Sequence, residues 1–303
     1  MLIHRLKQAY FAQKGDIVPE LNSEINALSG FSGTKFLKCL QSLAKLFVTE
    51  DTCYAEVGVF QGLTLMSVAS EIPHFEAIGI DNFAFFDKEK QNQKIIEERR
   101  AKFGLNNVKL VNKDYEDALL DFKNIANNKI GLYLIDGPHD YRSQMMCLLY
   151  AMPHLADESV IVVDDCNYKH VRQANRDFLI THPDYKLIFE SYTPAHPNNQ
   201  APDIREDSRD GWWNGINIIV KDVDGVLETM FPPVENDKSL FVNDHTMHSI
   251  KYPEHVTKFI PIINKVSSFM AGRWHPQDKF LGVFDKLNTQ SDGLQERLNG
   301  AIK

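Results

Sequence analysis

The chain has 303 residues, of which 43% are hydrophobic and 24% are charged. These proportions are close to those of globular proteins and exclude a wholly disordered chain. Its 33 basic and 41 acidic residues leave a net charge of −8, which argues against a protein that binds nucleic acid by neutralising phosphates.

The N-terminal segment predicts neither a membrane span nor a secretion signal. No apolar run in the chain reaches about 18 residues, the length a membrane-spanning helix needs. His4, Arg5 and Lys7 interrupt the first apolar residues, so the continuous core of a signal peptide is missing. The four cysteines form no CxxC pair and are expected to be reduced thiols. We therefore expect a cytoplasmic protein without a membrane partner.

Residues 1–49 are predicted to form a helical N-terminal extension. From Thr34 to Phe47 the apolar side chains recur at helical spacing, and Thr34 is the expected N-cap. This helix is expected to pack against the domain that follows.

Residues 50–221 alternate between predicted strands and helices. Five short runs are almost continuously apolar: 54–59, 77–80, 108–111, 131–135 and 160–163. Such runs, joined by helical segments, are typical of a doubly wound α/β fold with a parallel sheet buried on both faces. Two further strands, at 185–190 and 215–221, predict a mostly parallel sheet of seven strands.

The remaining segments are harder to assign. Residues 191–214 are rich in Pro, Asn, Asp and Arg, and a segment of this length is either a surface loop anchored by Trp212 and Trp213 or a lid beside an acceptor site. Residues 222–303 are predicted to be a C-terminal extension of mixed short elements, including a helix over 256–270 that Pro261 delays or kinks.

A glycine-bearing turn follows the first predicted strand and reads E-V-G-V-F-Q-G from Glu56 to Gly62. Gly58 and Gly62 permit a tight turn and a close approach of a ligand to the backbone. The N–H groups at the start of the next helix are free to bind a polar ligand. The dinucleotide pattern GxGxxG needs a third glycine, so a nicotinamide oxidoreductase is disfavoured.

Carboxylates also follow the second and third predicted strands. Asp81 ends the second strand, where an acid can accept both hydroxyls of a ribose, and Asp114 follows the third. Ligands of open α/β sheets bind at the carboxyl ends of the strands. Together with Glu56 on the first strand, these two acids fit an adenosine ligand without a pyrophosphate.

This order of motifs, E-x-G-x-x-x-G and then an acid after each of the next two strands, resembles the class I S-adenosylmethionine-dependent methyltransferases. The resemblance implies a Rossmann-like methyltransferase fold with S-adenosylmethionine as cofactor. It implies that Glu56, Gly58 and Gly62 frame the methionine part. It also implies that Asp81 holds the ribose and that Asp114 lies near the adenine.

Acids also end the fourth and fifth predicted strands. The fourth runs into I-D-G-P-H-D-Y with Asp136, and the fifth into V-V-D-D-C-N with Asp164 and Asp165. Neighbouring strands lie about 4.8 Å apart, so these acids should share one rim, where Asp136 also contacts the cofactor. Their repulsion requires either a hard divalent cation such as Mg²⁺ or shared protons with raised pKa values. The residues alone leave both possibilities open.

The same two motifs resemble a methyltransferase subset that includes macrolide-sugar O-methyltransferases and cephalosporin hydroxylase-like proteins. They are more distantly similar to catechol O-methyltransferase, whose metal site has an Asp and then an Asp-Asn pair. In this chain Cys166 separates Asp165 from Asn167, so that pattern is not matched residue for residue and Asn167 is not assigned as a ligand. The resemblance implies that Asp136, Asp164 and Asp165 are the metal ligands.

The resemblance implies an O-methyltransferase, assisted by Mg²⁺, that acts on a small polyhydroxylated acceptor such as a sugar or a natural product. A coordinating cation lowers the pKa of a hydroxyl. His139 is the candidate base because the ordinary pKa of histidine is about 6.5. Asp136 or Asp165 acting directly as the base is the alternative.

Two other functions stay open. Some relatives are hydroxylases, and the acids could serve that reaction instead. The chain could also be a non-catalytic binding subunit of a biosynthetic complex, and its two extensions could form a homo-oligomer. No nucleic-acid partner is expected.

Overall fold

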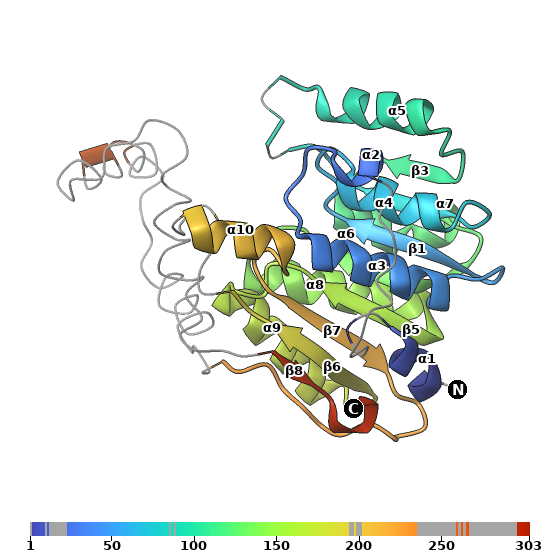
Figure 1. The fold of residues 1–303 in the computed structure, drawn as a ribbon, viewed down its shortest axis with the longest axis vertical. Helices are drawn as coiled ribbons and strands as arrows, with labels where there is room; N and C mark the ends of the chain where they lie inside the picture. The colour runs from blue at the N-terminus through green and yellow to red at the C-terminus, as the bar shows by residue number, and fades with distance from the viewer. Residues whose placement is uncertain are drawn as a thin grey trace.

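The computed structural model describes residues 2–9, 11, 23–84, 86–87, 89–193, 197, 202–234, 259, 262, 265–266 and 296–303. At its centre is an eight-stranded sheet of order β3-β2-β1-β4-β5-β7-β6-β8 (Figure 1). The strands are β1 Thr52–Val57, β2 Ala77–Ile80, β3 Val108–Val111, β4 Lys129–Ile135, β5 Leu155–Val163, β6 Tyr185–Ser191, β7 Ile216–Lys221 and β8 Arg297–Leu298.

Strands β1 to β5 pair in parallel, whereas β7 pairs antiparallel with both β5 and β6. The predicted doubly wound, mostly parallel α/β fold is confirmed. The predicted count of seven strands is wrong, because β8 adds an eighth at the edge, antiparallel to β6. β8 has two residues, one of them Arg297, so it carries no apolar run that would predict it.

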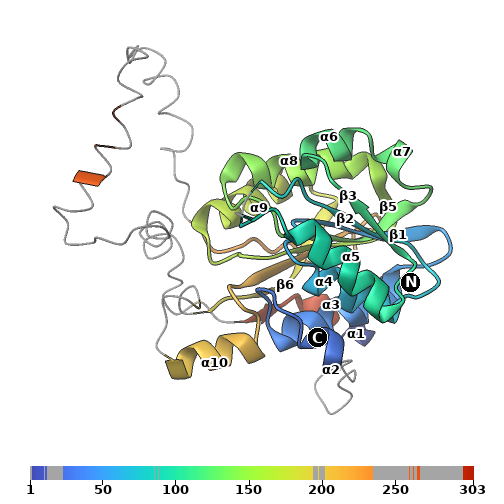
Figure 2. The same ribbon diagram turned by 90° about the horizontal axis from the view of Figure 1, so that it is seen from above.

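Helices cover both faces of the sheet (Figure 2). The α-helices are α1 Leu2–Gln8, α2 Ser23–Asn26, α3 Thr34–Phe47, α4 Leu63–Glu71, α5 Asn92–Phe103, α6 Tyr115–Leu120, α7 Phe122–Ile125, α8 Tyr141–Ala151, α9 Lys169–Thr181 and α10 Pro202–Asp210. Two 3₁₀ turns, Met152–His154 and Gly300–Ile302, complete the described helical elements.

Each face of the sheet has its own apolar layer. Tyr54, Leu132 and Val162 pack with α3 and α4 on one face. Ala55 and Tyr133, which alternate with them, pack with α6 to α9 on the other. Burial on both faces explains why the strand sequences are continuously apolar.

The N-terminal segment packs on the first of these layers. The apolar stripe of α3 is buried against α4 and the sheet, as the helical spacing predicts. The cap differs from the prediction: Gly33 occupies the N-cap position with extended backbone, and Thr34 is the first helical residue.

Helix α10 lies inside 191–214, the segment that the sequence predicts to be a surface loop or a lid, without a helix. Trp212 and Trp213, which follow it, are both buried. The helix predicted over 256–270 falls almost wholly outside the described residues. No helix in the described part of the chain is long and apolar enough to cross a membrane.

Candidate active site

The turns after β1, β2, β4 and β5 meet at one edge of the sheet. Backbone hydrogen bonds join them: Gly58 N–H to the Ile80 carbonyl at 3.0 Å, and Asp136 N–H to the Val57 carbonyl at 2.9 Å. The acids predicted for this edge therefore lie on a rigid base. A hollow of about 610 Å³ lies at the opposite edge, between segments such as 73–76 and 106–109 that precede the strands, away from these acids.

Gly58 makes the closest backbone approach at this edge. Its φ is +88°, and a Cβ atom there would lie 1.7 Å from the Asp136 carbonyl oxygen. Gly62, with φ of +81°, sits at the N-cap of α4. Only glycine fits the first position, and this close approach sets the turn against Asp136 at the end of β4.

Asp81 holds the glycine turn in place. Its carboxylate accepts the backbone N–H groups of Val59 and Phe60, each at 2.9 Å, and that of Phe83 at 2.7 Å. A carboxylate offers about four acceptor positions, so three bonds leave little capacity for a ribose. Binding of a ribose by Asp81 therefore stays a prediction. Its structural role, which is to hold the glycine turn, was not indicated by the sequence.

Asp114 has a capping role. Its Oδ1 accepts the Glu116 N–H at 2.9 Å at the N-cap of α6, and its Oδ2 accepts from Asn82 at 3.3 Å. Its predicted place near the adenine is untested by these contacts.

Glu56 is completely buried on β1. Its Oε2 accepts the Tyr54 hydroxyl at 2.5 Å, and its Oε1 accepts the Thr64 hydroxyl at 3.2 Å. Burial raises the pKa of Glu56 to about 8, although both hydrogen bonds oppose the rise. Tyr54 could have been found from the sequence, because side chains two apart on a strand share a face.

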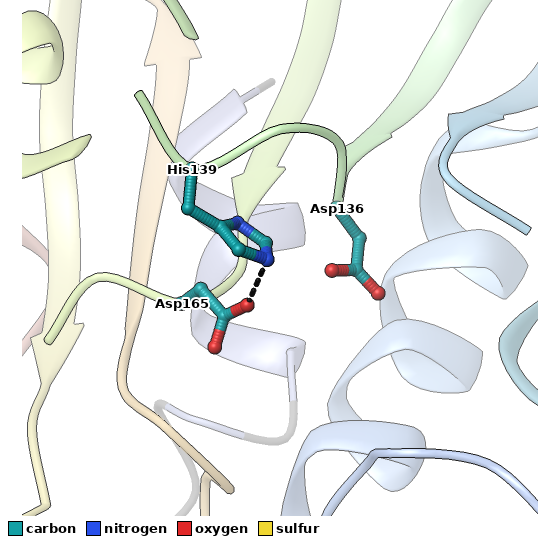
Figure 3. A group of neighbouring side chains, drawn as sticks. All are labelled: Asp136, His139 and Asp165. Atoms are coloured by element: carbon teal, nitrogen blue, oxygen red, sulfur yellow. Dashed lines mark ion pairs between the residues drawn. The ribbon is translucent and has the colours of Figure 1, made fainter. Parts of the chain in front are cut away.

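Three side chains converge at the rim: Asp136, His139 and Asp165 (Figure 3). Each offers an atom that can bind a metal, and these atoms lie within 4.8 Å of one another. His139 Nε2 is 2.7 Å from Asp165 Oδ2, and the imidazole stacks on Tyr168 at 5.1 Å. The structure thus brings together the candidate base and two of the three predicted metal ligands.

The Asp165 side chain points into the cluster from a backbone with an unusual conformation. Its φ is +55°, a region that Asp tolerates better than most residues. Asn214 donates to its Oδ1 at 2.5 Å, so both carboxylate oxygens are held. Sequence reasoning missed Asn214, which stands 49 positions away in the chain and follows the two tryptophans.

Asp164 does not join the group of three. It is buried, and its Oδ1 accepts the Asp165 N–H at 2.8 Å. Asn167 also faces elsewhere: its amide donates to the Thr193 carbonyl oxygen and hydroxyl and accepts the Thr193 N–H. Among the described residues, His139 takes the place in the cluster that was predicted for Asp164.

The acids raise one another's pKa values. Burial is the main cause of the raised pKa of Asp136, and the charges of Asp164 and Asp165 raise it further. Burial is also the main cause of the raised pKa of Asp164, followed by the charge of Asp165. Within the described chain no side chain donates a hydrogen bond to the Asp136 carboxylate. A cation or a shared proton at this rim would relieve the repulsion.

Residues 55–166, which carry the glycine turn and all these acids, match the protein family described as "Methyltransferase domain". The match covers this part of the chain alone and indicates a methyltransferase domain there. Within this part of the chain, the glycine turn from Gly58 to Gly62 follows β1, and Asp136 and His139 follow β4.

Similar proteins were found in two further comparisons. An uncharacterized protein of Acanthamoeba polyphaga mimivirus is 28% identical over 131 residues, which cover 42% of this chain and 57% of that protein. The chain thus spans little more than half the length of this curated relative.

Similar solved structures include the O-methyltransferase TomG from Streptomyces achromogenes with bound SAM. It is 13% identical, with a TM-score of 0.46 over 73% of this chain and 89% of that one. The O-methyltransferase from Bacillus cereus with bound SAH is 12% identical, with a TM-score of 0.47 over 73% and 90%. Likeness at this level does not identify an acceptor.

Proposed function

We propose that this protein is an S-adenosylmethionine-dependent O-methyltransferase that acts on a hydroxyl of a small polyhydroxylated acceptor, such as a sugar or a natural product. The observation that carries the proposal is the His139–Asp165 pair beside Asp136, next to the glycine turn. When bound, S-adenosylmethionine supplies a methyl group on a sulfonium sulfur, and transfer forms a C–O bond as the C–S bond breaks.

The His139–Asp165 pair provides a place for the hydroxyl proton. A bond of 2.7 Å between Nε2 and Oδ2 contains one proton, so His139 donates and Asp165 accepts when the pair is alone. A cation on the Asp165 carboxylate would take this acceptor away from Nε2. With the single imidazole proton then on Nδ1, Nε2 would be the basic atom that faces the site. Tyr168, stacked on the imidazole, keeps the ring in this direction.

The donor set fits a divalent cation. Asp136 and Asp165 supply the carboxylate oxygens that Mg²⁺ prefers, with water completing its shell. A metal that also accepts imidazole, such as Mn²⁺, would use His139 as a third ligand. Either ion would hold an acceptor hydroxyl at the rim and lower its pKa. Mg²⁺ remains our expectation for the two-carboxylate arrangement.

A methyl-labelled donor tests the proposal with a panel of hydroxylated acceptors and with Mg²⁺ or Mn²⁺. We expect the product to gain one CH₂, and His139→Gln to slow transfer by roughly 100-fold or more, as loss of a general base does. His74→Gln, on the opposite edge of the sheet, is the matched control and should leave the rate unchanged.

A product that gains an oxygen atom would instead support a hydroxylase. Absence of labelled product from every hydroxyl acceptor, in protein that binds S-adenosylhomocysteine, would contradict the proposal. Full function of the Asp165→Asn variant in cells would favour a non-catalytic binding subunit.

A further inference from the structure

The turn after β5 carries Asp165, whose carboxylate points at His139 (Figure 3). The turn spans four residues, because the Tyr168 N–H donates to the Asp165 carbonyl at 3.0 Å. Asp165 has a φ of +55°, which is unfavourable for a residue with a side chain and persists where neighbouring groups fix it. The direction of the carboxylate therefore depends on what holds the turn.

The two central residues of this turn, Cys166 and Asn167, are completely buried. Their N–H groups donate to the carbonyls of Gly215 and Asn214, each at 2.9 Å. Their own carbonyl oxygens also need donors, because a buried backbone carbonyl without a partner is unfavourable. The conformation of the turn therefore requires donors from elsewhere in the fold.

Arg172 on α9 supplies these donors. Its Nη1 atom donates to the Cys166 carbonyl at 2.7 Å and to the Asn167 carbonyl at 2.8 Å. Within the described part of the chain, these two carbonyls are the only hydrogen-bond acceptors of the guanidinium. All four backbone groups of the two central residues are thus paired, and one side chain pairs both carbonyls.

The position of Arg172 is unfavourable for a cation. The side chain is buried in the first turn of α9, and the helix dipole disfavours positive charge at that end of a helix. Burial also lowers the pKa of the guanidinium. Its hydrogen bonds go to neutral carbonyl oxygens and not to a carboxylate. The bonds to the turn are therefore what this buried arginine contributes.

An aromatic ring holds the guanidinium in place. Arg172 lies over the Tyr192 ring, 5.2 Å from the ring centroid, and a cation is attracted to such a ring face. The Tyr192 hydroxyl donates to Glu190 at 2.6 Å and accepts from Asn217 at 3.0 Å, so the ring itself is fixed. Arg172 thus connects the end of β6 to the turn that carries Asp165.

We propose that Arg172 is a positioning residue, which holds the turn after β5 in the conformation that directs Asp165 at His139. Without it, two buried carbonyls lose their donor, and Asp165 relaxes toward the negative φ values that side-chain-bearing residues favour. Its carboxylate then turns away from His139. The inference rests on the proposed function for its effect on methyl transfer, whereas the His139–Asp165 bond is measurable without any reaction.

Proton NMR of protein freed of divalent cations by a chelator tests this bond directly. The imidazole N–H that donates to Asp165 is assigned by its loss in His139→Gln. In Arg172→Met we expect it to exchange with water roughly tenfold faster, the factor of one lost hydrogen bond. Arg172→Lys keeps a charged donor and should restore most of the protection. Arg100→Met is the matched control, because Arg100 also donates to a backbone carbonyl, that of Val108 at the opposite edge of the sheet.

Methyl transfer provides a second readout, in variants with unchanged circular dichroism and unchanged S-adenosylhomocysteine affinity. The kcat of Arg172→Met should fall roughly tenfold with an unchanged KM for S-adenosylmethionine, because only the geometry of the acid pair is lost. Arg172→Lys should recover most of this rate. Tyr192→Leu removes the ring under the guanidinium and should also speed the exchange, so the test stays open if Arg172→Met does not fold.

Several results would overturn the inference. They are wild-type exchange in folded Arg172→Met or Tyr192→Leu, equal exchange in Arg172→Lys and Arg172→Met, an equal effect of Arg100→Met, faster exchange with unchanged kcat, or no protected His139 signal in the wild type. Faster exchange in Arg172→Met, without methyl transfer by any form of the protein, would refute the proposed function alone. Methyl transfer by the wild type with unchanged exchange in the variants would refute only this inference.

Discussion

The buried Glu56 should make the protein less stable as pH rises. Its pKa in the folded protein is about 8, against an ordinary value of 4.5. Because the folded pKa is the higher one, the folded protein keeps a proton that the unfolded chain loses between these two values. The free energy of unfolding therefore falls as pH rises through this window, and the contribution is complete only below the unfolded pKa.

The magnitude follows from the two pKa values. Each pH unit inside the window is worth about 1.4 kcal/mol, so the wild type should lose about 3 kcal/mol between about pH 5 and pH 7.5 from this group. Glu56→Gln removes the titration and keeps the shape. The amide oxygen can still accept from Tyr54, and the amide nitrogen can donate to the Thr64 hydroxyl.

Urea denaturation at several pH values measures this. The difference in unfolding free energy between Glu56→Gln and wild type should grow with pH by about 3 kcal/mol over the window. Glu89→Gln, at an exposed surface position, is the control and should run parallel to the wild type. Parallel curves for Glu56→Gln, within about 0.5 kcal/mol, would refute the assignment of Glu56 as a carboxyl group that burial keeps protonated.

Two further predictions concern the edges of the site. Arg297→Gln should lower the unfolding free energy by about 1–2 kcal/mol in urea titrations, because it removes an ion pair from the buried Glu190; an unchanged midpoint would contradict this. Asn214→Ala should slow methyl transfer by about tenfold with S-adenosylhomocysteine affinity unchanged, because Asp165 Oδ1 loses its donor; a wild-type rate would count against that positioning role.

The parallel sheet and its turn were predictable because their signals are local. Continuous apolar runs mark strands buried on both faces, and the glycines of E-V-G-V-F-Q-G mark the close approach that Gly58 makes to Asp136. Contacts between residues far apart in the sequence leave no such local signal. Asn214 pairs with Asp165 across 49 residues, and β8 is a two-residue strand held by pairing with β6.

Adjacent acids are a second limit on prediction. Asp164 and Asp165 follow β5 directly, and the residue types alone do not say which of the two carboxylates reaches Asp136 and His139; in the structure it is Asp165. The positive φ of Asp165 decides which one does, and that backbone angle is set by the turn and not by the residue type. Helix α10 was also missed, because its charged and polar composition is that of a loop. It begins at Pro202, and proline favours the first position of a helix, but the composition outweighed this signal.

Calorimetric titration of S-adenosylhomocysteine tests most directly whether the turn after β1 is the cofactor site. Gly58→Ala places a Cβ against the Asp136 carbonyl, and Gly104→Ala is the matched control, since it also has a positive φ but open space around it. We predict that the wild type and Gly104→Ala bind with equal affinity, and that Gly58→Ala, shown by circular dichroism to be folded, gives no binding heat. Wild-type affinity in the folded Gly58→Ala variant would contradict the assignment.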